Sequence, residues 1–259
     1  MLSTYKLRIA LAQQKISPDR EANIMKGLNL IKRALQVKAN IVILPELFNT
    51  GFYEHCLSSV RMLEEELEMV LKLSRERDIL IVAGVAEKSD TLYNSAVVIH
   101  RGKIIGVYRK NLLFPLTRER ELFKPGKKLE VFDTPFGRLG ILICYEVRFP
   151  ELAKRLMKMG AEIIAIPAEF PKQRIEHWKT LLRARAIENQ LFVAGVNCVE
   201  GDLDCGGNSM LIDPEGRVLA EGGIYQEVLM CDIDLAEVQR TRERLPFLKD
   251  YESLDSTPC

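Results

Sequence analysis

Short apolar runs alternate along the chain with longer stretches in which apolar residues recur every three or four positions. Runs without a polar residue, such as residues 41–44, predict strands that are buried on both faces of a sheet. The stretches between the runs predict amphipathic helices, so the pattern is that of an α/β protein. Strands are expected at residues 6–13, 41–44, 79–85, 92–100, 103–108, 129–132, 138–143, 162–166, 192–197, 209–212, 217–220 and 228–233.

Helix boundaries follow from capping residues. Ser17 is expected to cap the first helix with Pro18 at its first position, and apolar residues at 24, 28, 31 and 35 then share one face. Gly160 is expected to end a later helix. Helices are therefore predicted near residues 17–35, 60–71, 150–159, 176–189 and 235–244, with an extended tail after the last.

Two turns, Arg101-Gly102 and residues 134–137, are expected to join neighbouring strands into hairpins. Each half of the chain then runs strand, helix, strand, helix, strand and ends in hairpins. Two sheets packed face to face, with helices outside both, would bury the wholly apolar strands. We therefore predict an α/β fold, a four-layer α-β-β-α sandwich, formed by residues 1–259 as a single domain.

The composition excludes several classes of partner. The chain has 37 Lys and Arg against 36 Asp and Glu, so a net charge of +1 gives no field that attracts nucleic acid or an anionic membrane. No apolar run approaches the roughly 20 residues of a membrane span. Residues 1–8 lack the apolar core of a signal peptide. A cytoplasmic protein that acts on a small molecule is expected.

The cysteines are expected to be reduced thiols. A chain of 259 residues without an export signal has no need of disulfides. None of the cysteines forms a Cys-x-x-Cys pair, so no zinc or other metal site is expected, and no organic cofactor is implied. The six are Cys56, Cys144, Cys198, Cys205, Cys231 and Cys259.

Three chemically active side chains each follow a predicted strand. Glu46 comes after residues 41–44, Lys110 after 103–108, and Cys144 ends the run 138–143. One rim of the sandwich could gather all three, and a thiol there could attack the carbon of an amide or nitrile. Glu46 would take the thiol proton, while Lys110 and the backbone N–H of Tyr145 would stabilise the charge on the substrate oxygen.

In these segments the chain resembles the nitrilase superfamily of carbon–nitrogen hydrolases. The resemblance extends over almost the whole chain and is clearest in Pro45-Glu46, Arg109-Lys110 and the run from Cys144 to Glu151. It implies that Glu46 is the base, Lys110 the oxyanion stabiliser and Cys144 the nucleophile. It also implies a four-layer sandwich that assembles as a homodimer or larger homo-oligomer.

A second carboxylate is implied by the same resemblance. Family members carry one before a Phe-x-Pro-Gly element, which begins here at Phe123, and Glu119 matches that position. Glu119 is expected to hold Lys110 and the substrate in place. Leu112 departs from the family, which often has His two residues after the lysine.

The substrate is expected to be a small linear amide. The segments 167–170 and 176–178 resemble the omega-amidase branch, which releases ammonia from the terminal amide of dicarboxylate monoamides such as α-ketoglutaramate. Candidate substrate contacts are Phe170, Arg174, Trp178 and Arg148. Trp178 could instead belong to the core, and for Arg148 we favour a structural ion pair with Glu146 or Glu151 over substrate binding.

Other functions stay open at this stage. An N-carbamoyl amidohydrolase or a nitrilase would use the same covalent Cys144 chemistry. A catalytically silent interaction module is the alternative outside the enzymes. A papain-like pair of cysteine and histidine has His55, His100 and His177 available but lacks the usual flanking signatures.

Overall fold

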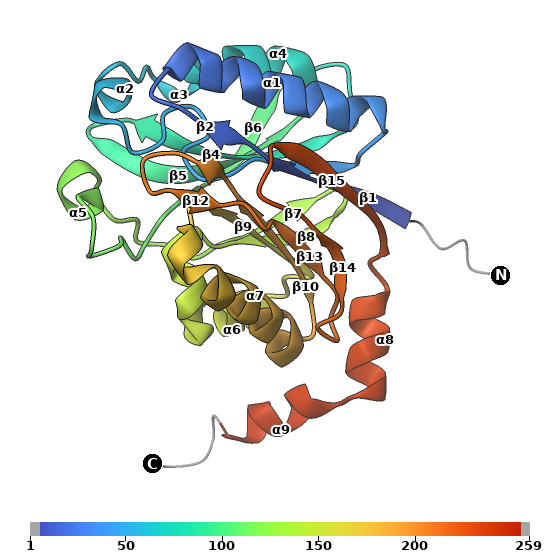
Figure 1. Ribbon diagram of the computed structural model, residues 1–259. Helices are drawn as coiled ribbons and strands as arrows, with labels where there is room; N and C mark the ends of the chain where they lie inside the picture. The colour runs from blue at the N-terminus through green and yellow to red at the C-terminus, as the bar shows by residue number, and fades with distance from the viewer. Residues whose placement is uncertain (1–5, 255–259) are drawn as a thin grey trace.

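Two six-stranded sheets pack face to face in the computed structural model, which describes residues 6–254 and their side chains as far as residue 251. The strand orders are β15-β1-β3-β4-β5-β6 and β14-β13-β10-β9-β8-β7. Helices lie outside both sheets (Figure 1), so the predicted α-β-β-α sandwich is confirmed.

Each sheet has three parallel strands at its centre and antiparallel strands at its edges. The first sheet contains β1 (Lys6–Gln13), β3 (Ile41–Ile43), β4 (Leu80–Lys88), β5 (Leu92–His100), β6 (Lys103–Arg109) and β15 (Glu227–Asp234). The second contains β7 (Val131–Thr134), β8 (Gly137–Ile141), β9 (Ile163–Ala168), β10 (Phe192–Asn197), β13 (Met210–Ile212) and β14 (Val218–Glu221). A small third sheet joins β2 (Lys15–Ile16), β11 (Val199–Glu200) and β12 (Cys205–Gly206).

The helices divide between the two outer faces and the carboxyl-terminal arm. The first sheet is covered by α1 (Arg20–Gln36), α2 (Glu54–Ser58), α3 (Leu63–Glu66) and α4 (Glu68–Ser74). The second sheet is covered by α6 (Pro150–Lys158) and α7 (Ile175–Asn189). Short turns of helix are α5 (Glu119–Leu122), η1 (Cys144–Arg148) and η2 (Lys172–Arg174). The chain ends in α8 (Glu237–Arg244) and α9 (Phe247–Leu254), which lead away from the sandwich (Figure 1).

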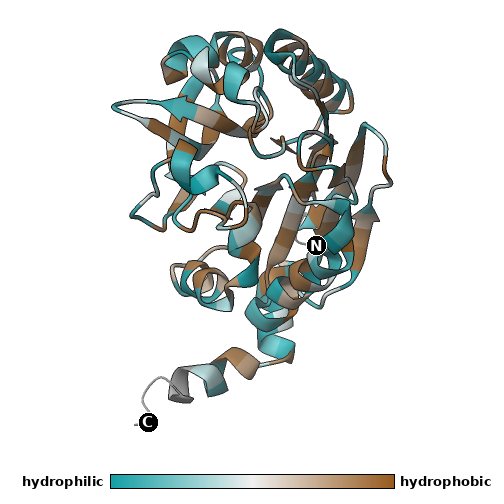
Figure 2. Ribbon diagram, turned by 60° about the vertical axis from the view of Figure 1, so that its left-hand side comes forward, coloured by the Kyte–Doolittle hydropathy of each residue, from teal (hydrophilic) through white to brown (hydrophobic). Residues whose placement is uncertain are grey.

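Three hydrophobic layers explain why these sequences form these elements. Side chains from both sheets meet between them, among them Leu11, Val98 and Ile141. The alternate positions of the same strands face the helices, as Val42 does toward α1 and Ile164 toward α6 and α7. Apolar residues therefore follow the strands and the inner faces of the helices (Figure 2). Strands that are buried on both faces need the uninterrupted apolar runs of this sequence.

Several predicted boundaries were wrong. The cap of α1 is Asp19, whose carboxylate accepts a hydrogen bond from the N–H of Ala22, and Ser17 and Pro18 lie before the helix. The helix predicted for residues 60–71 is broken into α3 and α4. The tail predicted to be extended is helical over Phe247–Leu254. The turn at Arg101-Gly102 is confirmed, with positive φ at both residues.

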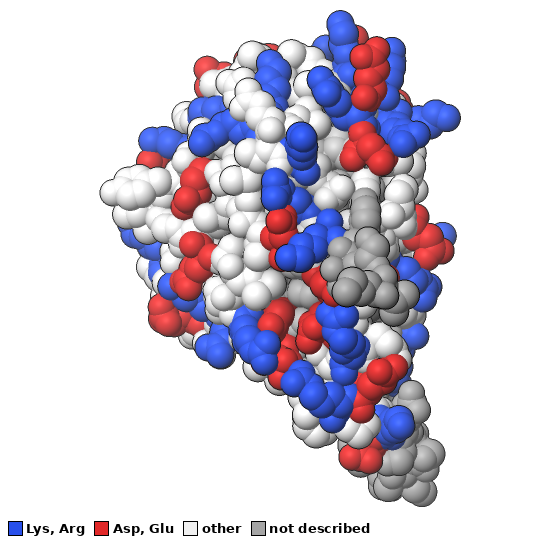
Figure 3. Space-filling view, turned by 90° about the vertical axis from the view of Figure 1, so that its right-hand side faces the viewer, with Lys and Arg blue, Asp and Glu red and all other residues white. Residues whose placement is uncertain are grey.

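Charge is mixed on the face shown in Figure 3, where basic and acidic side chains alternate. None of the helices within residues 6–254 is long and apolar enough to cross a membrane.

Candidate active site

Glu46 is carried by a tight loop after β3. Leu47 has a positive φ of 45°, and the N–H of Phe48 donates to the carbonyl of Gly84 on β4. A Cβ at Gly84 would lie 2.4 Å from the carbonyl oxygen of Pro45 and 2.6 Å from Cα of Glu46. Only glycine lets β4 approach the loop so closely. The loop is therefore held against the sheet, and Glu46 is fully buried.

Lys110 follows the last residue of β6 and is buried as well. Its backbone N–H donates to the carbonyl of Asn94 on β5, and its own carbonyl accepts from Gly126. A Cβ at Gly126 would lie 2.2 Å from the carbonyl oxygen of Arg109. The glycine that ends the Phe-x-Pro-Gly element therefore permits a close backbone contact beside Lys110. The same segment carries α5, which delivers Glu119.

Cys144 occupies a strained position at the first residue of η1, shortly after β8. Its φ is +46°, an uncommon conformation for a residue with a side chain. The Glu146 carboxylate accepts hydrogen bonds from the N–H of Ile143 at 2.8 Å and from the hydroxyl of Tyr108 at 2.8 Å. It also accepts from the N–H of Asn111 at 2.8 Å. Glu146 thereby ties the turn that carries Cys144 to the segment that carries Lys110.

Burial shifts the pKa of Glu146 strongly. Desolvation raises it to about 7 although the N–H of Ile143, the charge of Lys110 and the hydroxyl of Tyr108 each lower it. The sequence suggested Glu146 only as an ion-pair partner for Arg148. A glutamate two residues after a thiol carries no separate signal of this bridging role.

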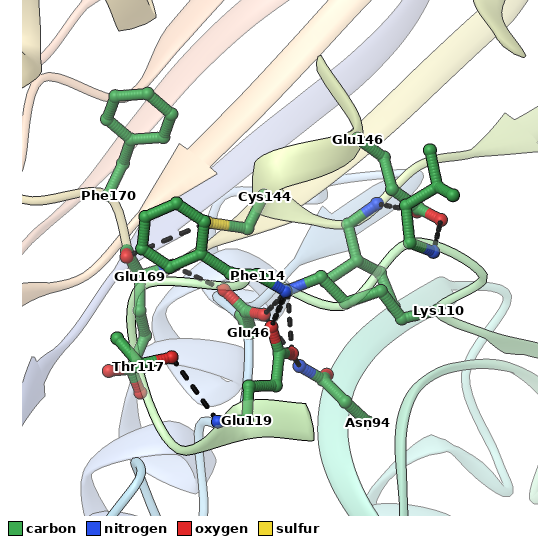
Figure 4. Close-up of polar contacts among 12 residues, drawn as sticks. Glu46, Asn94, Lys110, Phe114, Thr117, Glu119, Cys144, Glu146, Glu169 and Phe170 are labelled. Carbon is green, nitrogen blue, oxygen red and sulfur yellow. Dashed lines mark hydrogen bonds and ion pairs between the residues drawn. The ribbon is translucent and has the colours of Figure 1, made fainter. Parts of the chain in front are cut away.

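The three candidate catalytic groups converge with Glu119 and Asn94 (Figure 4). The ammonium of Lys110 donates to Glu46 at 2.8 Å and to both oxygens of Glu119 at 2.8 and 3.0 Å. The amide nitrogen of Asn94 donates to the same two carboxylates, at 2.7 Å each. Glu119 also accepts from the N–H of Phe114 at 2.6 Å. Sequence analysis missed Asn94, because a polar residue inside a strand gives no sign of where it points.

Cys144 approaches this network through the peptide of Glu169. Its thiol lies 3.6 Å from the carbonyl oxygen of Glu169, whose N–H donates to Glu46 at 2.8 Å. Burial and then the charge of Glu46 raise the pKa of Cys144 well above its usual range, against the lowering effect of Lys110. Burial lowers the pKa of Lys110, but the charges of Glu119 and Glu46 outweigh it and the net shift is upward.

A pocket opens onto these groups and has apolar walls with a cationic side. Phe114, Tyr145, Phe170 and Leu203 line it, as do Arg148 and Arg174. Phe170 and Arg174, two of the predicted substrate contacts, line this pocket, and no histidine of the described residues is part of its lining.

Two of the four suggested substrate contacts need comment. Trp178 lies in the core beside Leu182, outside the pocket lining, and its indole N–H donates to the carbonyl of Asn208. Arg148 was predicted to pair with Glu146 or Glu151, and this prediction was wrong. Within the described part of the chain, Arg148 and Arg174 form no ion pair. Burial, and then the charge of Arg174, lower the pKa of Arg148.

Comparison with known proteins decides the family. The model of the carbon–nitrogen hydrolase family matches residues 8–243. The chain belongs to the carbon–nitrogen hydrolase family. Members of this family are enzymes that hydrolyse carbon–nitrogen bonds, and the resemblance to the nitrilase superfamily found in the sequence is confirmed.

The relatives of this carbon–nitrogen hydrolase include amidases. It is 35% identical to the 2-oxoglutaramate amidase of Bacillus subtilis, over 95% of this chain and 97% of the relative. It is 32% identical to the omega-amidase NIT2 of Xenopus tropicalis, over 93% of each chain. The crystal structure of Nit3 from Saccharomyces cerevisiae, a member of branch 10 of the nitrilase superfamily, superposes with a TM-score of 0.85 at 29% identity, over 93% of this chain and 94% of that one.

Proposed function

We propose that the protein is an amidase of the omega-amidase type, in which Cys144 is the nucleophile, Glu46 the general base and Lys110 the oxyanion stabiliser. The observation that carries the proposal is that one pocket brings these three side chains together with two unpaired guanidinium groups. The relatives named above act on ω-amides, which supports the substrate class.

The first step joins the thiol to the amide carbon. Because burial keeps the thiol of Cys144 protonated, its proton passes to Glu46 as the carbon–sulfur bond forms. Negative charge then develops on the substrate oxygen, where the ammonium of Lys110 and the N–H of Tyr145 stabilise it. Glu46 returns the proton to the departing nitrogen, ammonia leaves, and a thioester remains on Cys144.

The second step hydrolyses the thioester. Glu46 takes a proton from a water molecule, whose oxygen attacks the acyl carbon, and the proton returns to the sulfur as the carboxylic acid leaves. Glu119 and Asn94 act as positioning residues. Glu119 accepts a hydrogen bond from Lys110 and Asn94 donates one to Glu46, but neither takes part in bond formation in these steps. Lys110 keeps its charge throughout, held by two carboxylates.

The guanidinium groups of Arg148 and Arg174 would bind the end of the substrate that lies away from the amide. Two cations that line one pocket, and that form no ion pair with the described residues, repel each other until an anion binds between them. A substrate carboxylate meets that need through bidentate hydrogen bonds. The apolar rings of Phe114 and Phe170 lie beneath the guanidiniums of Arg174 and Arg148, at 5.6 and 5.2 Å, and would hold the methylene chain between the carboxylate and the amide.

Ammonia release from a panel of amides tests the proposal. The wild type should hydrolyse α-ketoglutaramate and succinamate, and Cys144→Ala should abolish turnover while the fold is retained. Arg174→Met should raise KM for succinamate about 10-fold or more, as expected for one lost charged hydrogen bond, and change butyramide hydrolysis little. Arg183→Met, on α7 but outside the pocket, is the matched control.

Each alternative function has its own outcome in this panel. Turnover restricted to N-carbamoyl compounds or to nitriles would replace the substrate class but keep the Cys144 chemistry. A folded sample that releases ammonia from none of these compounds would favour a silent interaction module. Activity in Cys144→Ala close to that of the wild type would remove Cys144 from the role of nucleophile.

We also propose that residues 1–259 act as one catalytic domain in a cytoplasmic homodimer or larger homo-oligomer. Exposed apolar side chains at Ile224, Tyr225 and Phe247 support self-association. The free thiols at Cys56, Cys198, Cys205 and Cys231 fit a reducing compartment. Light scattering after size exclusion should give a mass of at least twice 29.5 kDa, and a monomeric mass at micromolar concentration would contradict it.

A further inference from the structure

A second cluster of reactive side chains lies next to the pocket, which one of its members, Glu169, also lines. Glu169 follows β9, Cys198 lies between β10 and β11, and Cys205 begins β12. One carboxylate oxygen and the two sulfur atoms lie within 4.8 Å of one another, and all three side chains are buried. The proposed catalytic steps use neither thiol and do not use the Glu169 carboxylate.

The Glu169 carboxylate has no hydrogen-bond donor. Glu169 is only 1% exposed, yet neither of its carboxylate oxygens has a donor among the described residues. Its nearest polar neighbours are the carboxyl of Asp202 and the thiols. Burial, followed by Cys205 and Asp202, raises the pKa of Glu169 well above its usual range. A buried carboxylate that faces two thiols lacks a positive partner, and a cation would provide one.

The backbone fits a shared ion better than a disulfide. Glu200 pairs with Cys205 across the β11–β12 hairpin, and Val199 pairs with Gly206, so Cys198 lies two residues from direct opposition to Cys205. Such diagonal positions have Cα atoms roughly 7–8 Å apart, which exceeds the usual disulfide span of about 4.4–6.8 Å. Two thiolates bound to one ion with bonds of about 2.3 Å need no such approach of their Cα atoms.

We propose that Glu169, Cys198 and Cys205 bind one divalent transition-metal ion of the zinc class. Two thiolates and one carboxylate are ligands that such an ion accepts, and a water molecule would take the fourth position of a tetrahedral site. The ion displaces the protons of the cluster when it binds, so its affinity rises with pH. The sequence showed no sign of this site because its cysteines are seven residues apart and its carboxylate lies 29 residues before the first of them.

The ion would act on the enzyme through the peptide of Glu169. That peptide donates to Glu46 and its carbonyl oxygen lies 3.6 Å from the thiol of Cys144. A bound ion would fix the Glu169 side chain and hence the backbone between the base and the nucleophile. The role would be structural, because the proposed catalytic steps use none of the three ligand side chains.

Cobalt binding tests the site apart from activity. Cys144→Ala serves as the parent, so that the proposed nucleophile cannot bind the metal. Addition of Co²⁺ to this metal-stripped protein should give thiolate charge-transfer absorption and strong visible bands that saturate at about one ion per chain. Cys198→Ser and Cys205→Ser in the same parent should each abolish the charge-transfer band or cut it at least about in half. Cys56→Ser and Cys231→Ser, which alter thiols outside the cluster, should leave it unchanged.

Zinc content and Glu169→Gln complete the test. Zn²⁺ should displace Co²⁺ from the parent, and Glu169→Gln should weaken binding at least about 10-fold. Circular dichroism of each variant, compared with the parent, separates ligand loss from unfolding. Charge-transfer absorption of undiminished intensity in Cys198→Ser and Cys205→Ser would overturn the site. A folded parent that binds neither ion would do the same. If Glu169→Gln in the protein that retains Cys144 changed KM for succinamate, while no variant bound metal, the carboxyl would face the substrate and the metal site would be wrong.

Discussion

Lys110 neutralises two buried carboxylates, and its removal should destabilise the protein in a way that depends on Glu119. The ammonium lies 2.8 Å from an oxygen of Glu46 and 2.8 Å from one of Glu119. Lys110→Met keeps most of the side-chain volume but leaves these two charges facing each other in the interior. Removal of one partner from a buried ion pair costs about 3–5 kcal/mol of unfolding free energy, which is the loss expected at pH 8.

The repulsion that remains can be estimated from the same distances. The two oxygens are no more than about 5.6 Å apart, twice their distance from the ammonium, and at an effective dielectric constant of about 20 two charges at that separation repel by about 3 kcal/mol. Glu119→Gln in the Lys110→Met background should therefore restore about 3 kcal/mol. In the wild type the same substitution removes the negative charge beside Lys110 and one of the two hydrogen bonds that Lys110 donates to Glu119, so it should destabilise the protein.

Urea unfolding of the wild type, both single variants and the double variant at pH 8 gives this cycle directly. The decisive result is that Glu119→Gln lowers the unfolding free energy of the wild type but raises that of Lys110→Met. Repetition at pH 5.5 should shrink the loss in Lys110→Met, because two carboxylates without their cation share a proton. Additive effects of the two substitutions, or a Lys110→Met variant as stable as the wild type, would refute the charge balance.

Three shorter predictions concern the surroundings of the site. Gly84→Ala should lower kcat at least about 10-fold and cost about 1–3 kcal/mol, because its Cβ meets the Pro45-Glu46 backbone, while Gly223→Ala, with nothing within 4 Å, should be neutral in both assays. Glu169→Gln in metal-free protein should flatten part of the pH dependence of stability, because the raised pKa of Glu169 keeps it protonated in the folded state. As pH rises above about 4.5, the wild type should lose up to about 1.4 kcal/mol of unfolding free energy per pH unit relative to the variant. A stability difference that does not depend on pH would contradict this. Trp178→Phe should cost about 2 kcal/mol in thermal or urea unfolding, through the hydrogen bond to Asn208 and the lost volume, with KM unchanged because Trp178 lies outside the pocket; a large rise in KM would contradict its place in the core.

The sequence predicted the sandwich because its signals are local. Residues 41–44 and 163–166 are apolar throughout, which only strands buried on both faces require, and Arg101-Gly102 has the positive φ angles of a tight hairpin. Glu46, Lys110 and Cys144 could be assigned to one rim because each follows a strand. The structure places them around one pocket.

The missed features depend on long-range contacts. Asn94 joins Glu46 to Glu119 across 48 and 25 residues of sequence, and no periodicity encodes such a bridge. Arg148 was expected to pair with a nearby glutamate, but Glu146 is occupied by backbone N–H groups and the hydroxyl of Tyr108. Capping was misjudged at Ser17 because Asp19, two residues later, offers the same chemistry.

The proposed base and the proposed nucleophile belong to different sheets: Glu46 follows β3 in the first and Cys144 follows β8 in the second. Side chains in the layer between them, such as Val98 and Ile141, together with the hydrogen bonds that Glu146 accepts from Tyr108 and Asn111, fix how far the two sheets slide past each other. Turnover should therefore depend on how the two sheets are aligned. Mild denaturant should abolish ammonia release at a concentration that leaves the circular dichroism of the protein unchanged. Activity should therefore be lost when the packing between the sheets weakens, before the secondary structure unfolds.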